Sequence, residues 1–594
     1  MPRRRWRGVR EAVALVWSTG PKQTTLLTVF SLVQAVLPFL GFYATKLLLD
    51  AVAGAVRENG SDRAARDAVV FAAAAAGIFL FGAVARAVAG LLAEERSRAV
   101  ADRVLAVVQE RAALADLSSF DDPDFHDALH RATQEAPTRS YGVIDGLLRV
   151  ARSLIGLVLS GLLLVPLHAS VAAVVFVAAV PAAFARLRAA RELERRRAED
   201  APREREAAYV GAVLSGPAHA KEVRAFDLGP RLAARFAALR VGLGADRLAL
   251  LKRQAFRDVS AQIVGSVAVF GAAAYAAAEA ARGRITLGDF ALYVQSVQAA
   301  AGAVGGLVGG AAVLFEHELL LDAYRRFRAL RPKTTDPARP AVLPTGPTEI
   351  VFEDVSFTYP GAARPALDGF SLRIRAGERV AVVGPNGAGK STLVKLICRL
   401  VDPERGVVRF GGTDARDFRL SDLRRLVAPV FQDFARYEFT VREILALGSP
   451  EAAADEPRLR AALKAAGADG FVAGMADGLD ARLGGRFRGG RELSVGEWQK
   501  LALARAFIRD AGVLVLDEPA SALDAAAEAD IADRVRTGAS GRTVVVVSHR
   551  WSTVAAADRV LVVEGGRLVE DGPPAVLLAR GGACTKLFER STRA

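Results

Sequence analysis

Long stretches without charge set the first half of the chain apart from the second. Residues 26–45 contain no Asp, Glu, Lys or Arg, residues 68–92 contain only Arg86, and residues 154–185 again contain none. About 20 apolar helical residues cross a hydrocarbon core about 30 Å thick. The pattern therefore predicts an all-α polytopic membrane domain of about six transmembrane helices over residues 1–330. We expect these spans at approximately 24–48, 68–92, 141–166, 169–187, 258–281 and 289–316.

Two long polar segments, residues 94–139 and 188–257, separate the hydrophobic pairs. Ala, Leu, Glu and Arg recur in both segments at helical spacing, so we predict that both are helical loops. Arginine-rich loops and termini stay on the cytoplasmic side of a membrane, and this rule puts both loops and the N-terminus there. We expect an integral, multi-pass plasma membrane protein, and the long inner loops favour a transporter over an anchored enzyme.

The pattern changes after residue 330. Residues 331–347 contain Pro332, Pro337, Pro340, Pro344 and Pro347, which cannot continue a helix, so we predict an extended linker. Over residues 348–594 short apolar runs alternate with helical stretches, which is typical of an α/β domain with a sheet buried on both faces. The runs predicted as strands are Ile350–Phe352, Val380–Val383, Val513–Leu516 and Thr543–Val547.

Composition and charge narrow the classes of partner. The 594 residues are 52% hydrophobic but 24% charged, so apolar and polar residues must be segregated along the chain. The formal net charge is +14, and most of it lies beside the apolar segments of the first 340 residues. A lipid bilayer explains this better than nucleic acid, which we do not expect as a partner. Cys398 and Cys584 are too isolated to build a disulfide framework or a cysteine metal site.

A phosphate-binding motif follows the second predicted strand. The pattern G-x-x-x-x-G-K-[ST] is matched by Gly384, Pro385, Asn386, Gly387, Ala388, Gly389, Lys390 and Ser391. Glycines let successive backbone N–H groups turn toward phosphate oxygens, and the following helix, which includes Thr392, adds its positive end. Lys390 would meet the outer phosphates and the Ser391 hydroxyl would reach Mg²⁺. We therefore predict ATP and Mg²⁺ as cofactors of an α/β P-loop ATPase.

Two carboxylates stand where the buried strand at 513–516 ends. Asp517 and Glu518 follow four apolar residues, and the carboxyl ends of parallel strands are where α/β sheets bind ligands. Asp517 suits the Mg²⁺ shell, through water. Glu518 suits a base that polarises the attacking water.

The second half of the sequence resembles the ATP-binding-cassette (ABC) transporter family. The family signature, usually LSGGQ, is matched by Leu493–Glu497, which read LSVGE and are followed by WQKLALARA. The sequence FQD contains Gln432 of the glutamine loop, and SALD ends in Asp524 of the D-loop. Further elements of the family are the switch histidine, His549, and the adenine-stacking aromatic residue, Tyr359.

The resemblance implies a role for each matched residue. Tyr359 would stack on adenine, Gln432 would sense the γ-phosphate and contact the metal with Ser391 and Asp517, and His549 would join Glu518 in catalysis. The signature residues Ser494, Gly496 and Glu497, together with Asp524, would contact nucleotide held by a second cassette chain. A homodimer is favoured, although a heterodimer is possible. Val495 and Glu497 depart from the usual glycine and glutamine, and valine does not readily adopt positive φ.

The first half is similar to the membrane domain of exporter-type half-transporters. Residues 118–132 and 220–230 resemble the regions that couple such domains to cassettes. Arg86, Asp145, Arg149 and Arg152 lie in or near spans, where they either line a substrate path or reach the inner interface. We expect ATP-driven export of a lipid, peptide or drug-like amphiphile. The alternatives are an importer of this fold, for example for a metal chelate, and a non-transporting ATPase sensor.

Overall fold

The computed structural model describes residues 10, 13–57, 62–165, 199–519, 525–538 and 541–592, with isolated positions between 166 and 198. The chain forms two compact units. One consists of Met1–Ala113 and Asp124–Leu330, and the other consists of Leu114–Pro123 and Arg331–Ala594. The short segment before Pro123 thus groups with the C-terminal unit.

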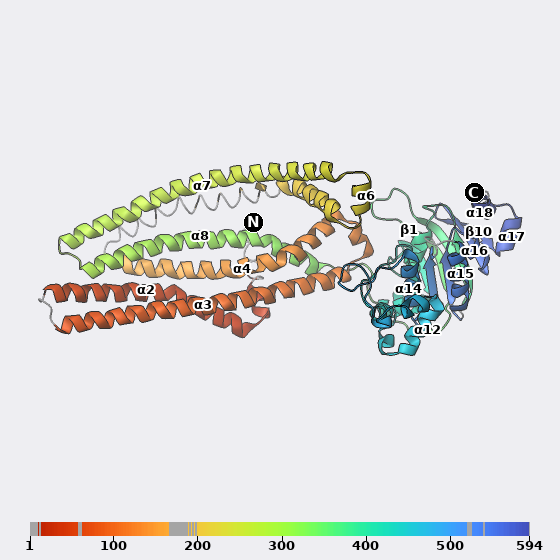
Figure 1. Ribbon diagram of the computed structural model, residues 1–594, viewed down its shortest axis with the longest axis horizontal. Helices are drawn as coiled ribbons and strands as arrows, with labels where there is room; N and C mark the ends of the chain where they lie inside the picture. Colours follow the sequence, from red (N-terminus) through yellow and green to blue (C-terminus); the bar gives the residue numbers. More distant parts are fainter. Residues whose placement is uncertain are drawn as a thin grey trace. The chain divides into compact units, whose positions relative to one another are not determined.

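The first unit consists of long helices that run alongside one another (Figure 1). Among the described residues, five helical segments are long and apolar enough to cross a membrane. The predicted span at 169–187 lies almost wholly outside the described residues. Among the described residues, this unit contains the helices α2 (Pro21–Arg57), α3 (Asp62–Ala113), α4 (Pro123–Leu164), α6 (Ala220–Ala225), α7 (Gly229–Ala281) and α8 (Leu287–Ala329), and residues 13–18 and 199–215 are also helical.

Small residues bring α4 and α8 close together. A Cβ added to Gly146 of α4 would lie 3.0 Å from a side-chain carbon of Leu314, and one added to Gly306 of α8 would lie 2.4 Å from Ser153 Oγ. Outward-facing side chains such as Phe79 and Phe270 are 60% and 73% exposed. Apolar side chains on the outside and small residues between helices are typical of a membrane domain.

The polar segments continue the helices that carry the spans. The helix α3 extends from Asp62 to Ala113, and α7 begins at Gly229, well before the apolar residues from Val259 onward. Backbone hydrogen bonds within a helix do not depend on side-chain polarity, so one helix can pass from lipid into water. The limits of the spans within these helices remain predictions.

The linker is ordered by contacts within the C-terminal unit. The backbone N–H groups of Lys333 and Thr334 donate to the carboxylate of Asp116, which precedes the 3₁₀ turn η1 (Leu117–Asp121). The buried Arg399 side chain donates to the carbonyl oxygens of Thr335, at 3.2 Å, and Phe418, at 3.1 Å. Residues 331–349 therefore run over the unit without forming a helix or strand.

The C-terminal unit contains two sheets. The smaller sheet is antiparallel, in the order β2-β1-β4-β5, and the larger has the order β10-β9-β3-β8-β7-β6. The strands of the smaller sheet are β1 (Ile350–Phe357), β2 (Leu367–Ile374), β4 (Arg405–Phe410) and β5 (Thr413–Asp414). Those of the larger sheet are β3 (Arg379–Val383), β6 (Val427–Val430), β7 (Val513–Asp517), β8 (Thr543–Val547), β9 (Arg559–Glu564) and β10 (Arg567–Gly572).

The parallel strands β3, β7 and β8 position the candidate site. Their side chains are almost all buried, as expected for a sheet covered on both faces. In the register of the sheet, Val382 pairs with Val547, and Val547 pairs with Asp517. The three carboxyl ends therefore meet at one edge.

Helices cover this larger sheet (Figure 1). The α-helices are α9 (Lys390–Ile397), α10 (Leu420–Leu426), α11 (Val441–Ala446), α12 (Glu456–Ala466), α13 (Asp469–Ala473), α14 (Val495–Phe507), α15 (Ala525–Gly538), α16 (Trp551–Ala555), α17 (Pro574–Ala579) and α18 (Ala583–Thr592). The 3₁₀ turns are η2 (Ala415–Asp417), η3 (Pro450–Ala454) and η4 (Gly478–Asp480).

Candidate functional site

The phosphate loop joins β3 to α9 and requires glycine at two of its positions. Gly384 has φ 153°, and a Cβ there would lie 2.1 Å from the carbonyl oxygen of Val563. Gly389 has φ 103°, and a Cβ there would lie 2.5 Å from the carbonyl oxygen of Ala366. No side chain fits such distances, so neighbouring backbone fixes the shape of the loop. The loop then leads directly into the N-terminus of α9, which favours anions.

Lys390 bends back over this loop. Its Nζ donates to the carbonyl oxygens of Gly384, at 2.8 Å, and Pro385, at 2.9 Å. Burial lowers the pKa of the Lys390 ammonium from its usual value, while the nearby carboxylates of Glu518 and Asp517 oppose this shift. The loop thus holds a positive charge above its own backbone N–H groups, where the outer phosphates of a nucleotide would lie.

Ser391 and Asp517 bring two oxygen ligands together. Asp517 ends β7, is only 6% exposed and accepts a hydrogen bond from the Ser391 side chain. Burial raises the pKa of the Asp517 carboxyl above its usual value, and this hydrogen bond partly offsets the rise. Hydroxyl and carboxylate oxygens are the ligands that Mg²⁺ prefers, so the pair suits that ion.

Glu518 lies between two polar side chains from neighbouring elements. Gln432 Nε2 donates to Glu518 Oε2 at 2.9 Å, and His549 Nδ1 lies 3.4 Å from Glu518 Oε1. The backbone of Glu518 has φ 48°, which is uncommon for a residue with a side chain, and its N–H donates to Val547 O. Three residues far apart in sequence therefore meet at the carboxyl edge of the sheet. The Glu518 carboxylate, which Gln432 and His549 contact on two sides, could act as a base for a nearby water molecule.

Tyr359 lies beside the start of α9. Its hydroxyl is 3.2 Å from Thr392 Oγ1, and Lys395 Nζ lies 4.9 Å from the centre of its ring. Phe357 packs edge-on against the ring. The sequence predicted Tyr359 but gave no signal for Lys395, because a lysine on an amphipathic helix is usually an ordinary exposed residue.

The signature segment begins α14. Ser494 is its N-cap: Glu497 N–H donates to Ser494 Oγ at 3.3 Å, and Glu497 Oε2 accepts from Ser494 N–H at 2.8 Å. Val495 is the first helical residue, and it is not among the four described non-glycine residues with positive φ. The valine therefore fits this backbone without strain. The departure from glycine leaves the helix start intact.

The signature and the phosphate loop belong to different parts of the unit. The helix α14 is buried in a core with α11 and α12, whereas α9 is buried in a core with β1 and β2. Ser494, Gly496 and Glu497 thus lie in the helical part of the cassette, where α12 and α14 are labelled in Figure 1. Asp524 lies outside the described residues.

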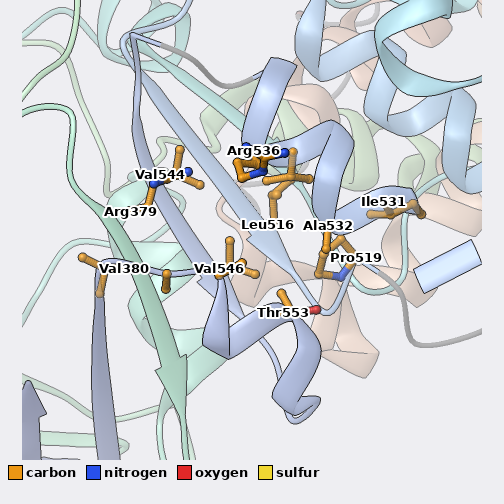
Figure 2. Close-up of a pocket in the computed structure, with 13 residues that line it drawn as sticks. Arg379, Val380, Leu516, Pro519, Ile531, Ala532, Arg536, Val544, Val546 and Thr553 are labelled. Carbon is orange, nitrogen blue, oxygen red and sulfur yellow. The ribbon is translucent and has the colours of Figure 1, made fainter. Parts of the chain in front are cut away.

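A small cavity lies beside strand β7 and is separate from this site. Figure 2 shows it between β7, β8 and the helices α15 and α16, with Leu516, Pro519, Ile531 and Val546 around it. Its volume is about 30 Å³, room for one or two water molecules. The cavity is too small to hold a nucleotide.

Residues 367–521 match the family model described as ABC transporter. The chain contains an ABC transporter domain over these residues. Its C-terminal unit is the ATPase cassette of such a transporter, and its N-terminal unit supplies several apolar helices of a multi-pass membrane protein. The predicted fold class, a helical membrane domain followed by an α/β P-loop cassette, is confirmed.

Several relatives are named for transport. The chain is 28% identical over 476 residues to the subtilin transport ATP-binding protein SpaT of Bacillus subtilis, covering 79% of this chain and 76% of the relative. It is 44% identical to an ATP-dependent lipid A-core flippase of Thiobacillus denitrificans, over 40% of each chain. It is 39% identical to a β-(1→2)glucan export ATP-binding/permease protein NdvA of Rhodopseudomonas palustris, over 49% of this chain and 46% of the relative. The matched part of the chain thus spans less than half the length of the last two relatives.

A solved structure has the same fold over almost the whole chain. The structure of a bacterial Atm1-family ABC exporter with ATP bound matches with a TM-score of 0.79, covering 94% of this chain and 98% of the other. Sequence identity is 24%, so this likeness is one of fold.

Proposed function

We propose that the protein is one half of an ATP-driven exporter in the plasma membrane. This proposal rests on the combination of features in one chain. The described residues contain one phosphate loop, the carboxylates Asp517 and Glu518 at the end of β7, and the signature segment at the start of α14, together with several apolar helices. The names of the relatives, which include a flippase and a glucan exporter, support the outward direction. The arginine-rich inner loops support a cytoplasmic position for the cassette and the N-terminus.

The chemistry assigned to the cassette is attack of water on the γ-phosphate of ATP. Glu518 polarises the water, and Gln432 and His549 hold its carboxylate from two sides. Lys390 and the loop N–H groups stabilise the charge that develops on the phosphate oxygens. Ser391, Asp517 and Gln432 would hold Mg²⁺, which supplies further positive charge to the phosphates when bound.

Two chains complete each other's sites in this proposal. The signature residues and the phosphate loop lie in different cores of one cassette, so a head-to-tail pair would bring the Ser494 end of one to the nucleotide of the other. Asp524 is assigned to the same contact. Lys390, Asp517, Glu518 and His549 are all present, which favours a homodimer with two working sites over a heterodimer with a degraded partner.

The dimer and its turnover can be tested on the purified chain in phosphatidylcholine nanodiscs. We expect a dimer by mass photometry and ATP hydrolysis that depends on Mg²⁺. Glu518→Gln should be dimeric and bind ATP but lose turnover. A monomeric, inactive wild type that gains activity only with a different cassette chain would contradict the homodimer.

Two other functions remain as alternatives to export. An importer of the same fold would move its substrate into the cytoplasm, and a sensor would hydrolyse ATP without net flux. The direction of ATP-dependent movement across inside-out vesicles separates all three. In the export proposal the substrate is a lipid, peptide or drug-like amphiphile.

A further inference from the structure

Two arginines of α4 lie deep in a candidate membrane span. The span covers Ile144–Leu164, and Arg149 and Arg152 both fall within it. Arg152 precedes Leu164 by 12 residues, which is about 18 Å of helix at 1.5 Å per residue. Half of a hydrocarbon core is about 15 Å. Arg152 therefore lies near the middle of the bilayer if Leu164 marks its outer edge.

These arginines belong to a polar cluster that joins three helices. Arg152 donates to Gln34 Oε1 of α2 at 3.2 Å, and Gln34 Nε2 donates to the carbonyl oxygen of Ala85 in α3 at 2.9 Å. On α4 itself, Arg149 donates to Asp145 at 2.6 Å, and Arg152 lies 3.7 Å from the other carboxylate oxygen. The cluster is defined here as Gln34, Asp145, Arg149 and Arg152.

The cluster occupies one side of α4. Residues 145, 149 and 152 recur at the spacing of one helical face, and Gln34 shows that this face meets α2. A second face, marked by Gly146 and Ser153, packs against α8 instead. The charged face is therefore not the one that holds α4 to α8.

The charges of the cluster do not cancel. One carboxylate serves two guanidinium groups, so the cluster carries a net charge of about +1. The Arg149 and Arg152 side chains remain 47% and 34% exposed, while Asp145 is 21% exposed. Both guanidinium groups therefore keep accessible N–H donors. A charge at this depth is costly in lipid, and such residues usually face water or a ligand.

We propose that this cluster binds the anionic group of the transported substrate, and that the substrate is an amphiphile carrying a phosphate or carboxylate. Guanidinium groups form paired hydrogen bonds with both kinds of oxyanion. An anion held at this depth in the hydrocarbon core needs an apolar portion that lies among the lipid chains, which is why we infer an amphiphile. This inference rests on the proposed export function and names the substrate class for it.

The test measures binding without ATP, so it does not depend on turnover. Radiolabelled dodecyl phosphate is titrated against the protein in phosphatidylcholine nanodiscs, with dodecyltrimethylammonium as the cationic competitor and unlabelled dodecyl phosphate as the anionic one. We expect saturable binding that is displaced by the anionic competitor but not by the cationic one. Dioleoyl phosphatidylglycerol added to the nanodisc distinguishes two sources of the anionic group. If this lipid competes with dodecyl phosphate, the cluster binds a lipid headgroup. If it does not compete, the cluster binds a single-chain amphiphile.

Four variants separate binding from folding. The double variant Arg149→Gln/Arg152→Gln should weaken dodecyl phosphate binding at least tenfold. Arg149→Lys/Arg152→Lys should recover only part of this binding, because lysine retains the charge but not the paired hydrogen bonds. Asp145→Asn should tighten binding, since it removes the competing carboxylate. Arg282→Gln, at the exposed turn after α7, is the matched control and should have no effect.

The proposal is overturned if the cationic amphiphile binds as well as the anionic one, or if Asp145→Asn weakens binding as much as the double glutamine variant does. The latter result would mean that the four residues only hold α2, α3 and α4 together. Failure of the export function would appear elsewhere, as absent ATP-dependent flux in protein that still binds dodecyl phosphate.

Discussion

Replacing Glu518 by glutamine tests the assignment of the base most sharply. The amide has the size of the carboxylate but no basic lone pair, and the structure shows what surrounds it. Gln432 Nε2 donates to one oxygen at 2.9 Å, and His549 Nδ1 lies 3.4 Å from the other. An amide has one acceptor oxygen, so it can accept from only one of these two side chains.

The expected loss follows from the role of a base. General-base catalysis contributes about 10²–10⁴-fold to rate, so turnover should fall by that factor, equivalent to about 3–5 kcal/mol in the activation barrier. ATP affinity should change little, because Lys390 and the loop make the phosphate contacts.

The assay is phosphate release by the purified protein at saturating Mg-ATP, with ATP binding measured separately. Glu456→Gln on α12 is the control, because Glu456 pairs with Arg460 away from the site. Hydrolysis by Glu518→Gln at the parent rate would refute the reasoning and would require another base.

Four further predictions follow from the same geometry. Lys390→Ala should weaken ATP binding at least tenfold, measured by equilibrium dialysis, because the ammonium at the loop is lost; unchanged binding would contradict the phosphate-loop assignment. Ser494→Arg should abolish turnover, and mixing it with Lys390→Ala protein should restore part of it, since each mixed dimer has one intact composite site; no recovery in mixed dimers would argue against shared sites. Arg399→Ala should destabilise the cassette by about 3 kcal/mol and lower its thermal midpoint by roughly 6–12 °C, because the buried Arg399 side chain binds the linker carbonyl of Thr335. The control Arg405→Ala removes an exposed arginine and should have little effect on the midpoint. Burial raises the pKa of Asp517 above its usual 3.8. On acidification, Mg²⁺-dependent ATP binding should therefore decline at a higher pH than the pH at which an ordinary aspartate protonates. Asp517→Asn should remove this part of the pH profile.

Local motifs made most of the nucleotide site predictable. The phosphate loop and Asp517–Glu518 are contiguous in sequence, and their chemistry depends on backbone shape and strand ends that short patterns encode. The family resemblance implied that His549 acts together with Glu518, but it did not imply the contact between Gln432 and Glu518. The distances among the three come from the order of strands in the sheet, which no short pattern contains.

Contacts between distant residues could not be predicted. Asp116 binds the N–H groups of Lys333 and Thr334 across more than 200 residues, and Arg152 meets Gln34 across 118. Hydropathy also marks where side chains leave lipid, but not where a helix ends. The long helix α7 therefore gave separate signals for a polar loop and a span.

The central claim is ATP-driven export, and flux into inside-out vesicles tests it most directly. Vesicles from cells that express the wild type or Glu518→Gln would be incubated with a cytoplasmic extract and ATP, and their contents compared by mass spectrometry. We expect an anionic amphiphile to accumulate only in wild-type vesicles that are supplied with ATP. ATP hydrolysis by the wild type without any molecule that differs between the two vesicle preparations would contradict it.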